Sequence, residues 1–398
     1  MISSNDRAIL RELAKKQQDF AHLPIMQERE EMWLNHNELI GNDVPIHFEV
    51  GTFERELMPT LATSTDFARG VEWNLHRNML NHIHIDDDRV VPKTFDIPWH
   101  IRFLPFGIEI STQHTEGNAF KFDHVIQDLE KDFHKLGAPV ISCDKDKTLA
   151  EQVAIEDAIG DILPVRVVNG YALAASATQE IVKLMGMSQM YMALYDYSEL
   201  FTQMVEMLAD AYVNFFCFLK DEKLMTSNNG NDWLGQGSFS FYRENLLWGY
   251  ADSQETESIS PEAFGEFFFP LYSRITAGFD LISYGCCEPV HKIWESCLSK
   301  FANLRKVSIS PWCDEEYMGT VLKDSNVIFH RKPSPNFVGV GRVLDEDGFS
   351  QHIKKSLIAA RGCKLEIAFR DVLTTVGDIT KPRRAVEITR NQISKYWG

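Results

Sequence analysis

Residues 281–291 read LISYGCCEPVH, a short apolar run that ends in two cysteines, a glutamate and a proline. The apolar positions are consecutive, so both faces of the strand that they predict would be buried, as in a parallel sheet. Similar β-rich runs recur along the chain. Together with 281–286 they predict eight strands, the others being 46–51, 89–91, 162–168, 223–227, 304–308, 327–331 and 365–369.

Helical patterns separate several of these strands. We expect one helix over 116–136, two helices within 176–220, one that begins at Ser260-Pro261 and ends near Gly278, and one over 289–302. The alternation predicts an α/β fold with a parallel sheet, and eight strands favour a closed (β/α)8 barrel, the TIM-barrel fold. An open doubly wound sheet is the alternative, but HFEVGTF (47–53) lacks the glycine-rich loop of dinucleotide-binding sheets.

The chain begins with two predicted helices, one capped by the stretch Ser4-Asn5-Asp6 and a second over 24–38. We therefore expect residues 1–44 to form a helical extension that packs on the barrel, and residues 45–398 to form the barrel itself. The stretch 92–115 does not fit the alternation and predicts a hairpin or an excursion. Long insertions on barrels usually cover the active mouth, so this one is expected to shape the pocket.

The composition is that of an acidic globular protein. Fifty-seven acidic and forty basic residues in a chain of 398 give a net charge of −17, which argues against nucleic acid and anionic membranes as partners. No apolar run reaches the ~18 residues of a membrane span, and residues 1–16 lack the apolar segment of a secretory signal. Seven cysteines, two of them adjacent, indicate cytosolic thiols or metal ligands rather than a disulfide framework. We therefore expect a cytoplasmic protein.

In a barrel, reactive side chains lie where the strands end. The densest group of such side chains follows the predicted strand 281–286 and contains Cys286, Cys287, Glu288 and His291. Thiolate, carboxylate and imidazole are zinc ligands, so the segment predicts a metal or catalytic site. Adjacent strand residues point to opposite faces, so both thiols can reach one ion only if the strand ends between them. Alternatively, one cysteine simply packs in the core.

Three further segments supply candidates. Asp252 and Glu255 can act as general acid or base, or as metal ligands, unless they belong to a solvated loop. Lys332 ends a cationic stretch and can hold a carboxylate or a phosphate. The pair Arg370-Asp371 follows the last predicted strand and is either functional or a structural salt bridge.

Two upstream segments are more ambiguous. The stretch 228–233 (NNGNDW) is rich in hydrogen-bonding groups, so Asn229 and Asp232 can orient a small ligand, although the same stretch is typical of a turn. His82 and His84 precede three aspartates, a pattern that can bind metal, but their polar surroundings favour a surface position. No GxSxG nucleophile motif and no CxxC or HExxH metal motif occurs.

Several of these segments resemble a known family. The order of elements and the stretches 10–33, SQETESISPEAFGEFFFP (253–270), LISYGCCEPVH (281–291) and LRKVSISPWCD (304–314) are similar to the uroporphyrinogen decarboxylase superfamily. They are most similar to its branch of corrinoid-dependent, O-demethylase-type methyltransferases. The resemblance covers nearly the whole chain. It implies a decorated (β/α)8 barrel that uses zinc near its mouth and passes a methyl group to or from a cobalamin protein.

The chain departs from the family's zinc site. The thiol methyltransferases of the superfamily carry His-x-Cys at this strand end and a further cysteine near the last strand. The matching positions here are Tyr284 and Cys286, and the last strand ends in Arg370-Asp371 with no cysteine. The zinc ligands are therefore expected to be Cys286, Cys287 and Glu288, or no zinc binds.

The chain also departs from the decarboxylase itself. That enzyme carries an arginine-rich motif early in the barrel, which holds an octacarboxylate porphyrinogen. The first strand here continues as HFEVGTFERE, with Glu49, Glu54 and Glu56. An acidic mouth repels such a substrate, so porphyrinogen decarboxylation is discounted.

Residues and resemblance together predict a methyltransferase that moves a methyl group from a small methylated substrate, for example a phenyl methyl ether, to the cobalt of a separate corrinoid protein. Zinc, or an acid such as Asp252 or Glu255, would activate the leaving group. No D-x-H-x-x-G corrinoid motif occurs, so the cobalamin would arrive on the partner. We assign catalytic roles to Asp252, Glu255, Tyr284 and Asp371, and substrate contacts to Asn229, Asp232, Trp248 and Lys332.

Two other classes stay open. One is a metal-free decarboxylase or lyase that acts on a small carboxylic acid through Lys332, Arg370 and Asp371. The other is a barrel that binds a ligand without catalysis. The sequence leaves the oligomeric state, a homodimer included, undecided.

Overall fold

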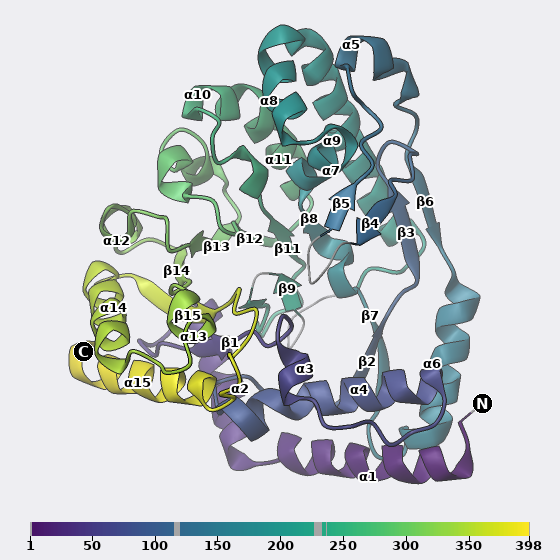
Figure 1. The fold of residues 1–398 in the computed structure, drawn as a ribbon, viewed down its shortest axis with the longest axis vertical. Coiled ribbons are helices and arrows are strands. Elements are labelled where there is room, and N and C mark those ends of the chain that lie inside the picture. The colour runs from purple at the N-terminus through teal and green to yellow at the C-terminus, as the bar shows by residue number, and fades with distance from the viewer. Residues whose placement is uncertain (1, 115–119, 227–232, 236, 398) are drawn as a thin grey trace.

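The computed structural model describes residues 2–114, 120–226, 233–235 and 237–397. Its centre is a curled sheet of seven strands, all parallel, in the order β1-β15-β14-β13-β12-β11-β8 (Figure 1). The first strand thus pairs with the last, as in a barrel. The strands are β1 (Ile46–Phe48), β8 (Ala174–Ala175), β11 (Trp248–Ala251), β12 (Leu281–Tyr284), β13 (Leu304–Ile309), β14 (Ile328–Arg331) and β15 (Lys364–Phe369). The predicted α/β barrel architecture is confirmed as this half-barrel surrounded by helices.

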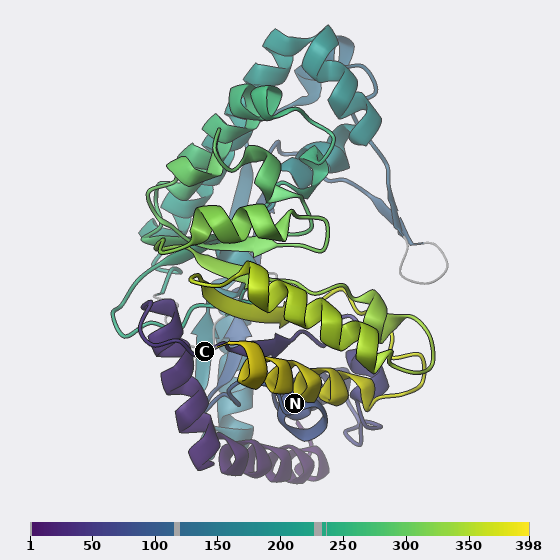
Figure 2. The same ribbon diagram turned by 90° about the vertical axis from the view of Figure 1, so that its left-hand side faces the viewer.

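Small sheets flank the half-barrel. Strand β2 (Phe95–Pro98) pairs in parallel with β7 (Val165–Val168), and β3 (Ile101–Leu104) pairs antiparallel with β6 (Val140–Cys143). Strand β4 (Thr112–His114) forms a hairpin with β5 (Phe120–Phe122), which projects from the body of the molecule (Figure 2). The stretch 92–115 therefore leaves the main sheet, as its sequence predicts, and supplies one strand to each of these three pairs.

Helices cover the outside of the sheet. The two N-terminal helices form as predicted, and α14 and α15 lie side by side on the outside of the late strands (Figure 2). The longer helices are α1 (Ser4–Ala21), α2 (Pro24–Asn37), α4 (Asp66–Leu80), α6 (Lys145–Ile159), α7 (Ala177–Met185), α8 (Met187–Asp196), α9 (Ser198–Asp221), α11 (Phe269–Thr276), α12 (Glu315–Leu322), α14 (Glu346–Ala359) and α15 (Lys381–Tyr396). Short ones are α3 (Glu54–Leu57), α5 (Leu129–Asp132), α10 (Pro261–Ala263) and α13 (Asn336–Gly339). No helix in the described part of the chain has both the length and the apolar character needed to cross a membrane.

Four predicted elements are wrong, and three helices, α7, α8 and α9, form where two are predicted within 176–220. Residues 89–91 form no strand, because their backbone lies against α2, where Val91 N–H reaches Met26 Sδ at 3.4 Å. The described part of 223–227 is a turn held by Asn169, whose amide bonds the backbone of Thr226 at 2.7 and 2.9 Å. The predicted helix 116–136 is replaced, where described, by β5 and the single turn α5. The predicted helix 289–302 consists of the 3₁₀ turns η6 (Val290–Ile293) and η7 (Leu298–Lys300).

A short hairpin, β9 (Trp233–Gly235) and β10 (Ser238–Phe239), lies inside the curl of the sheet. Ser238 Oγ lies 2.9 Å from Ser283 Oγ of β12. Gly237, at φ +78°, sits so close to β15 that an added Cβ would meet Ala368 Cβ at 3.1 Å. The ring of Phe239 packs on His47 and on Trp33 of α2. The hairpin and α2 thus fill the interior below the ends of the strands.

One glycine contact gives a direct test of the helix packing. A Cβ on Gly319 of α12 would lie 1.8 Å from the carbonyl oxygen of Ala359 in α14. We expect Gly319→Ala to lower the free energy of unfolding by about 3 kcal/mol in urea titrations, because backbone must move to admit the methyl group. Gly278→Ala is the matched control, since nothing lies within 4 Å of its added Cβ. Equal stability of the two variants would contradict this packing.

Candidate active site

The carboxyl ends of the parallel strands gather a set of polar side chains at one edge of the sheet. Glu49 follows β1, Asp252 follows β11, Lys332 follows β14, and the pair Arg370-Asp371 follows β15. Cys286, Cys287 and Glu288 follow β12. The carboxyl ends of parallel strands lie at the same edge of a sheet. Glu49 and Asp371, which are 322 positions apart in the chain, therefore become neighbours through the β1–β15 pairing.

Asp252 is one of the buried acids of this group, with 6% of its surface exposed. Its Oδ2 accepts hydrogen bonds from the Tyr250 hydroxyl at 2.7 Å and the Ser176 hydroxyl at 3.1 Å. Burial, reinforced by the nearby Glu288 carboxylate, raises the pKa of Asp252 to about 7. A carboxyl group with that pKa carries a proton in about half of the molecules at neutral pH and can both donate and accept it.

Glu255 and Glu288 have structural partners. Thr178 Oγ1 of α7 donates to Glu255 Oε2 at 2.7 Å, and burial raises the pKa of Glu255. Glu288 accepts the backbone N–H of Ser253 at 2.9 Å and that of Cys286 at 2.7 Å, one with each carboxylate oxygen. Glu288 therefore ties the loop after β11 to the loop after β12.

The two cysteines point the same way. Strand β12 ends at Tyr284, and Gly285 follows with a φ of +103°, so the alternation of faces stops before the thiols. Cys286 Sγ lies 3.5 Å from Cys287 Sγ and 2.9 Å from Gln254 Oε1, and Cys287 Sγ lies 3.5 Å from Asp371 Oδ2. The hydrogen bond to Cys287, together with burial, raises the pKa of Cys286, so it is a thiol at neutral pH.

These groups do not converge as a zinc site does. Zinc takes at least three protein ligands, and the residues that the structure describes contain no group of three His, Cys, Asp or Glu side chains arranged to hold a metal ion. Both oxygens of Glu288 already accept backbone N–H groups. The arrangement therefore does not fit zinc bound by Cys286, Cys287 and Glu288 without a rearrangement of Glu288, and that ligand set stays a prediction.

The adjoining rim of the site, beside the cysteines, contains ion pairs. Arg370 Nε lies 2.8 Å from Glu49 Oε2 and 3.4 Å from Asp371 Oδ1. Burial raises the pKa of Glu49. Lys332 is 3% exposed and its ammonium donates to the carbonyl of Cys286 at 3.0 Å. The cations of this rim are thus already engaged, which leaves Asp252 as the group best placed for proton transfer.

Two predicted site residues, Tyr284 and Trp248, have fully buried side chains. Tyr284 is fully buried, its ring packs against Tyr272, and its hydroxyl lies 2.6 Å from Ser253 Oγ, so it positions the β11 loop. Trp248 is fully buried inside the barrel, at the start of β11. The predicted ligand-orienting residues Asn229 and Asp232 lie outside the described residues.

Sequence reasoning missed the groups that hold Asp252. Tyr250 is two residues before Asp252 and therefore lies on the same face of β11. The alternation of side chains along a strand could have identified it from the sequence. Ser176 comes from the loop after β8, and only the β8–β11 pairing brings it near. Gln254, the partner of Cys286, was likewise missed.

Comparison with known proteins supports the architecture. No protein-family model and no curated protein sequence matches the chain. Among solved structures, a methyltransferase from Methanosarcina mazei is similar in fold, with a TM-score of 0.53, 12% sequence identity, and coverage of 93% of this chain and 99% of that one. Fold and site together define an α/β barrel-type protein with a buried acid at the carboxyl ends of its strands.

Proposed function

We propose that this chain is a methyltransferase that takes a methyl group from a small methylated substrate, such as a phenyl methyl ether, and passes it to the cobalt of a corrinoid held by a separate protein. The observation that carries the proposal is Asp252, a buried acid with a pKa of about 7 at the edge where barrel enzymes bind substrate. Likeness in fold to a methyltransferase agrees with it.

Breaking an ether C–O bond requires a better leaving group than a free alkoxide or phenoxide. The reduced corrinoid, when bound, supplies the nucleophile for the methyl carbon. Protonated Asp252 gives its proton to the departing oxygen, which leaves as a neutral alcohol or phenol. The resulting carboxylate is stabilised by the hydrogen bonds from Tyr250 and Ser176, and it regains a proton from solvent before the next turnover.

The loops around the site offer a surface for such a partner. Trp312 after β13, Val343 in the loop after β14 and Leu373 after β15 are 60%, 82% and 60% exposed. A contiguous exposed apolar patch commonly marks a protein–protein contact, and we infer that these three side chains contribute to one. We assign this rim to the corrinoid protein, whose cofactor must approach the strand ends.

The proposal is tested by methyl transfer to cob(I)alamin as acceptor, under anaerobic conditions, with a panel of phenyl methyl ethers and methylamines. We expect donor-dependent loss of the Co(I) absorption band with at least one donor, and release of the demethylated product. Absence of transfer with every donor, to free cobalamin and to corrinoid proteins alike, would overturn the proposal. Release of CO₂ from small carboxylic acids instead would favour the lyase alternative.

Metal removal separates the two ways of activating the leaving group. Because Asp252 can supply the proton and the described zinc ligands do not converge, we expect methyl transfer to survive exhaustive chelation. Elemental mass spectrometry of the same samples, beside a Cys286→Ser/Cys287→Ser variant, reports the zinc content. About one zinc per chain, absent from the variant and required for activity, would assign the activation to a metal ion instead.

A further inference from the structure

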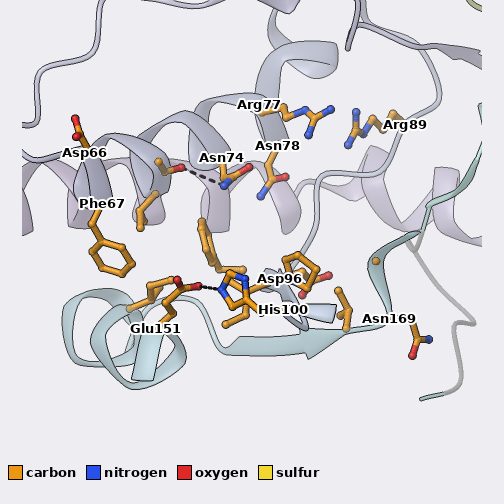
Figure 3. A pocket seen from close by; sticks show the side chains of 18 residues that line it. Asp66, Phe67, Asn74, Arg77, Asn78, Arg89, Asp96, His100, Glu151 and Asn169 are labelled. Carbon is orange, nitrogen blue, oxygen red and sulfur yellow. Dashed lines mark hydrogen bonds and ion pairs between the residues drawn. The ribbon is translucent and has the colours of Figure 1, made fainter. Parts of the chain in front are cut away.

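A cavity of about 590 Å³ lies between α4 and the β2–β7 pair (Figure 3). This volume is within the range of pockets that enclose small organic molecules. Phe67 and Val71 of α4, Phe95 and Ile97 of β2 and Ile155 of α6 supply an apolar wall. None of the residues assigned to methyl transfer lines the cavity.

Two arginines lie at one end of the cavity and Phe67 at the other (Figure 3). Arg77, on α4, pairs through Nε with Glu54 Oε2 at 2.7 Å. Arg89 is half-buried, and its guanidinium makes one hydrogen bond within the described part of the chain, at 3.3 Å to the neutral side chain of Asn81. No described carboxylate forms an ion pair with Arg89, so most of its five N–H donors are available.

Two of the three acids that line the cavity are already paired, and the third, Asp66, lies beside Phe67, at the end away from the arginines (Figure 3). Glu151 lies 2.7 Å from His100, and Asp96 receives two bonds from Arg166, at 2.9 and 2.6 Å. The carboxylates of Asp87, Glu54 and Glu49 act on the Arg89 charge without forming a direct ion pair with it in the described part of the chain. In partly buried surroundings a directly bonded anion stabilises a guanidinium more than it does at an exposed site. The chain has a net charge of −17, yet two arginines lie at one end of this cavity. An anionic ligand would balance the positive charge of this end.

We propose that this cavity binds a small organic acid, with its carboxylate on Arg89 and Arg77 and its flat apolar body along Phe67, Val71 and Phe95. The planar fork of Arg89 matches a carboxylate, which can accept two parallel N–H bonds. The site is separate from the proposed methyl-transfer site. It is tested by direct binding of a ligand to the isolated chain, without a partner or a methyl donor, so the result does not depend on the methyl-transfer proposal.

The test is isothermal titration with benzoate at pH 7, with benzamide as the neutral probe of the same shape. We expect benzoate to bind about tenfold or more tightly than benzamide, because only the acid offers a charged partner to the arginines. Arg89→Gln and Arg77→Gln should each weaken benzoate binding and leave benzamide unchanged. Binding of both probes with equal affinity, or none at millimolar concentration, would overturn the assignment.

A second variant removes the site without removing a contact. Gly70 lies on the cavity side of α4, and an added Cβ meets nothing within 4 Å. Gly70→Trp should fill the cavity, lower benzoate affinity about tenfold or more, and keep or raise the melting temperature, since glycine is a poor helix residue. Unchanged benzoate affinity in a folded Gly70→Trp protein would place the bound acid elsewhere and refute the site.

Discussion

Replacing Asp252 with asparagine is expected to lower kcat for methyl transfer about 100-fold or more, the usual contribution of a general acid. Asparagine keeps the shape and can still accept the hydrogen bonds of Tyr250 and Ser176, so the fold should survive. Only the transferable proton is lost. Donor-dependent kinetics with a fixed concentration of cob(I)alamin measure the effect. A variant with wild-type kcat would remove Asp252 from the reaction.

The pH dependence gives an independent readout of the same group. Wild-type kcat should fall as pH rises through about 7, where Asp252 loses the proton that it donates. Tyr250→Phe should move this limb to higher pH, because the tyrosine hydrogen bond lowers the pKa of Asp252. A purely structural role for Tyr250 would lower activity without moving the limb.

Stability should follow the same titration, with a definite sign. The folded-state pKa of Asp252 is raised from an ordinary value near 3.8 to about 7. The protonated group therefore stabilises the fold fully below about pH 4, and this contribution, up to roughly 4 kcal/mol, is lost as pH rises toward 7. Urea titrations at pH 5 and pH 8 measure this contribution. The free energy of unfolding should fall less from pH 5 to pH 8 in Asp252→Asn than in the wild type.

The late half of the barrel could be predicted because its strands are short, rich in apolar residues and buried on both faces. The runs at 281–286, 304–308, 327–331 and 365–369 all contain strands of the sheet. Strand β11 was missed because its sequence contains a glycine, Gly249. The packing requires this glycine, since a Cβ at this position would lie 2.5 Å from the ring of Phe279. Strand β8 has two residues, too few for any pattern to register.

The wrong helix at 289–302 has a physical cause. Val290, Ile293, Trp294, Cys297 and Leu298 are buried at spacings of three and four residues, as predicted for an amphipathic helix. A spacing of three residues is also the repeat of a 3₁₀ helix. Two such turns place these side chains in the core. Apolar periodicity alone cannot separate these conformations in so short a segment.

The candidate site could be predicted to the extent that strand ends carry it. Asp252, the two cysteines, Glu288 and Asp371 come together because parallel strands end at one edge. What the sequence could not supply is register across strands, which alone brings Ser176 to Asp252. The arginines of the proposed acid site lie on a helix and in a loop, twelve residues apart, in no recognisable motif.

The buried charge pair inside the barrel should give the largest change in stability. Lys306 is fully buried, and its ammonium lies 3.1 and 2.8 Å from the two carboxylate oxygens of Glu366. His36 Nε2 lies 3.0 Å from the same carboxylate, and His330 also bonds to it. Although burial opposes ionisation, Lys306 and His330 hold the pKa of Glu366 well below its usual range. Glu366 is therefore ionised in the folded protein, and its carboxylate opposes the lowering of the Lys306 pKa that burial causes.

Breaking this pair from one side leaves a charge in the interior. We expect Glu366→Gln to lower the free energy of unfolding by about 3 to 5 kcal/mol, because the Lys306 ammonium loses its anion. The double variant Lys306→Met/Glu366→Gln should recover a large part of that loss, giving a coupling energy of about 2 kcal/mol. Glu346→Gln, which breaks the exposed 2.8 Å pair with Arg384, is the matched control and should cost less than about 1 kcal/mol. If the double variant were no more stable than Glu366→Gln, the loss would come from the histidine contacts of Glu366 rather than from an unpaired lysine.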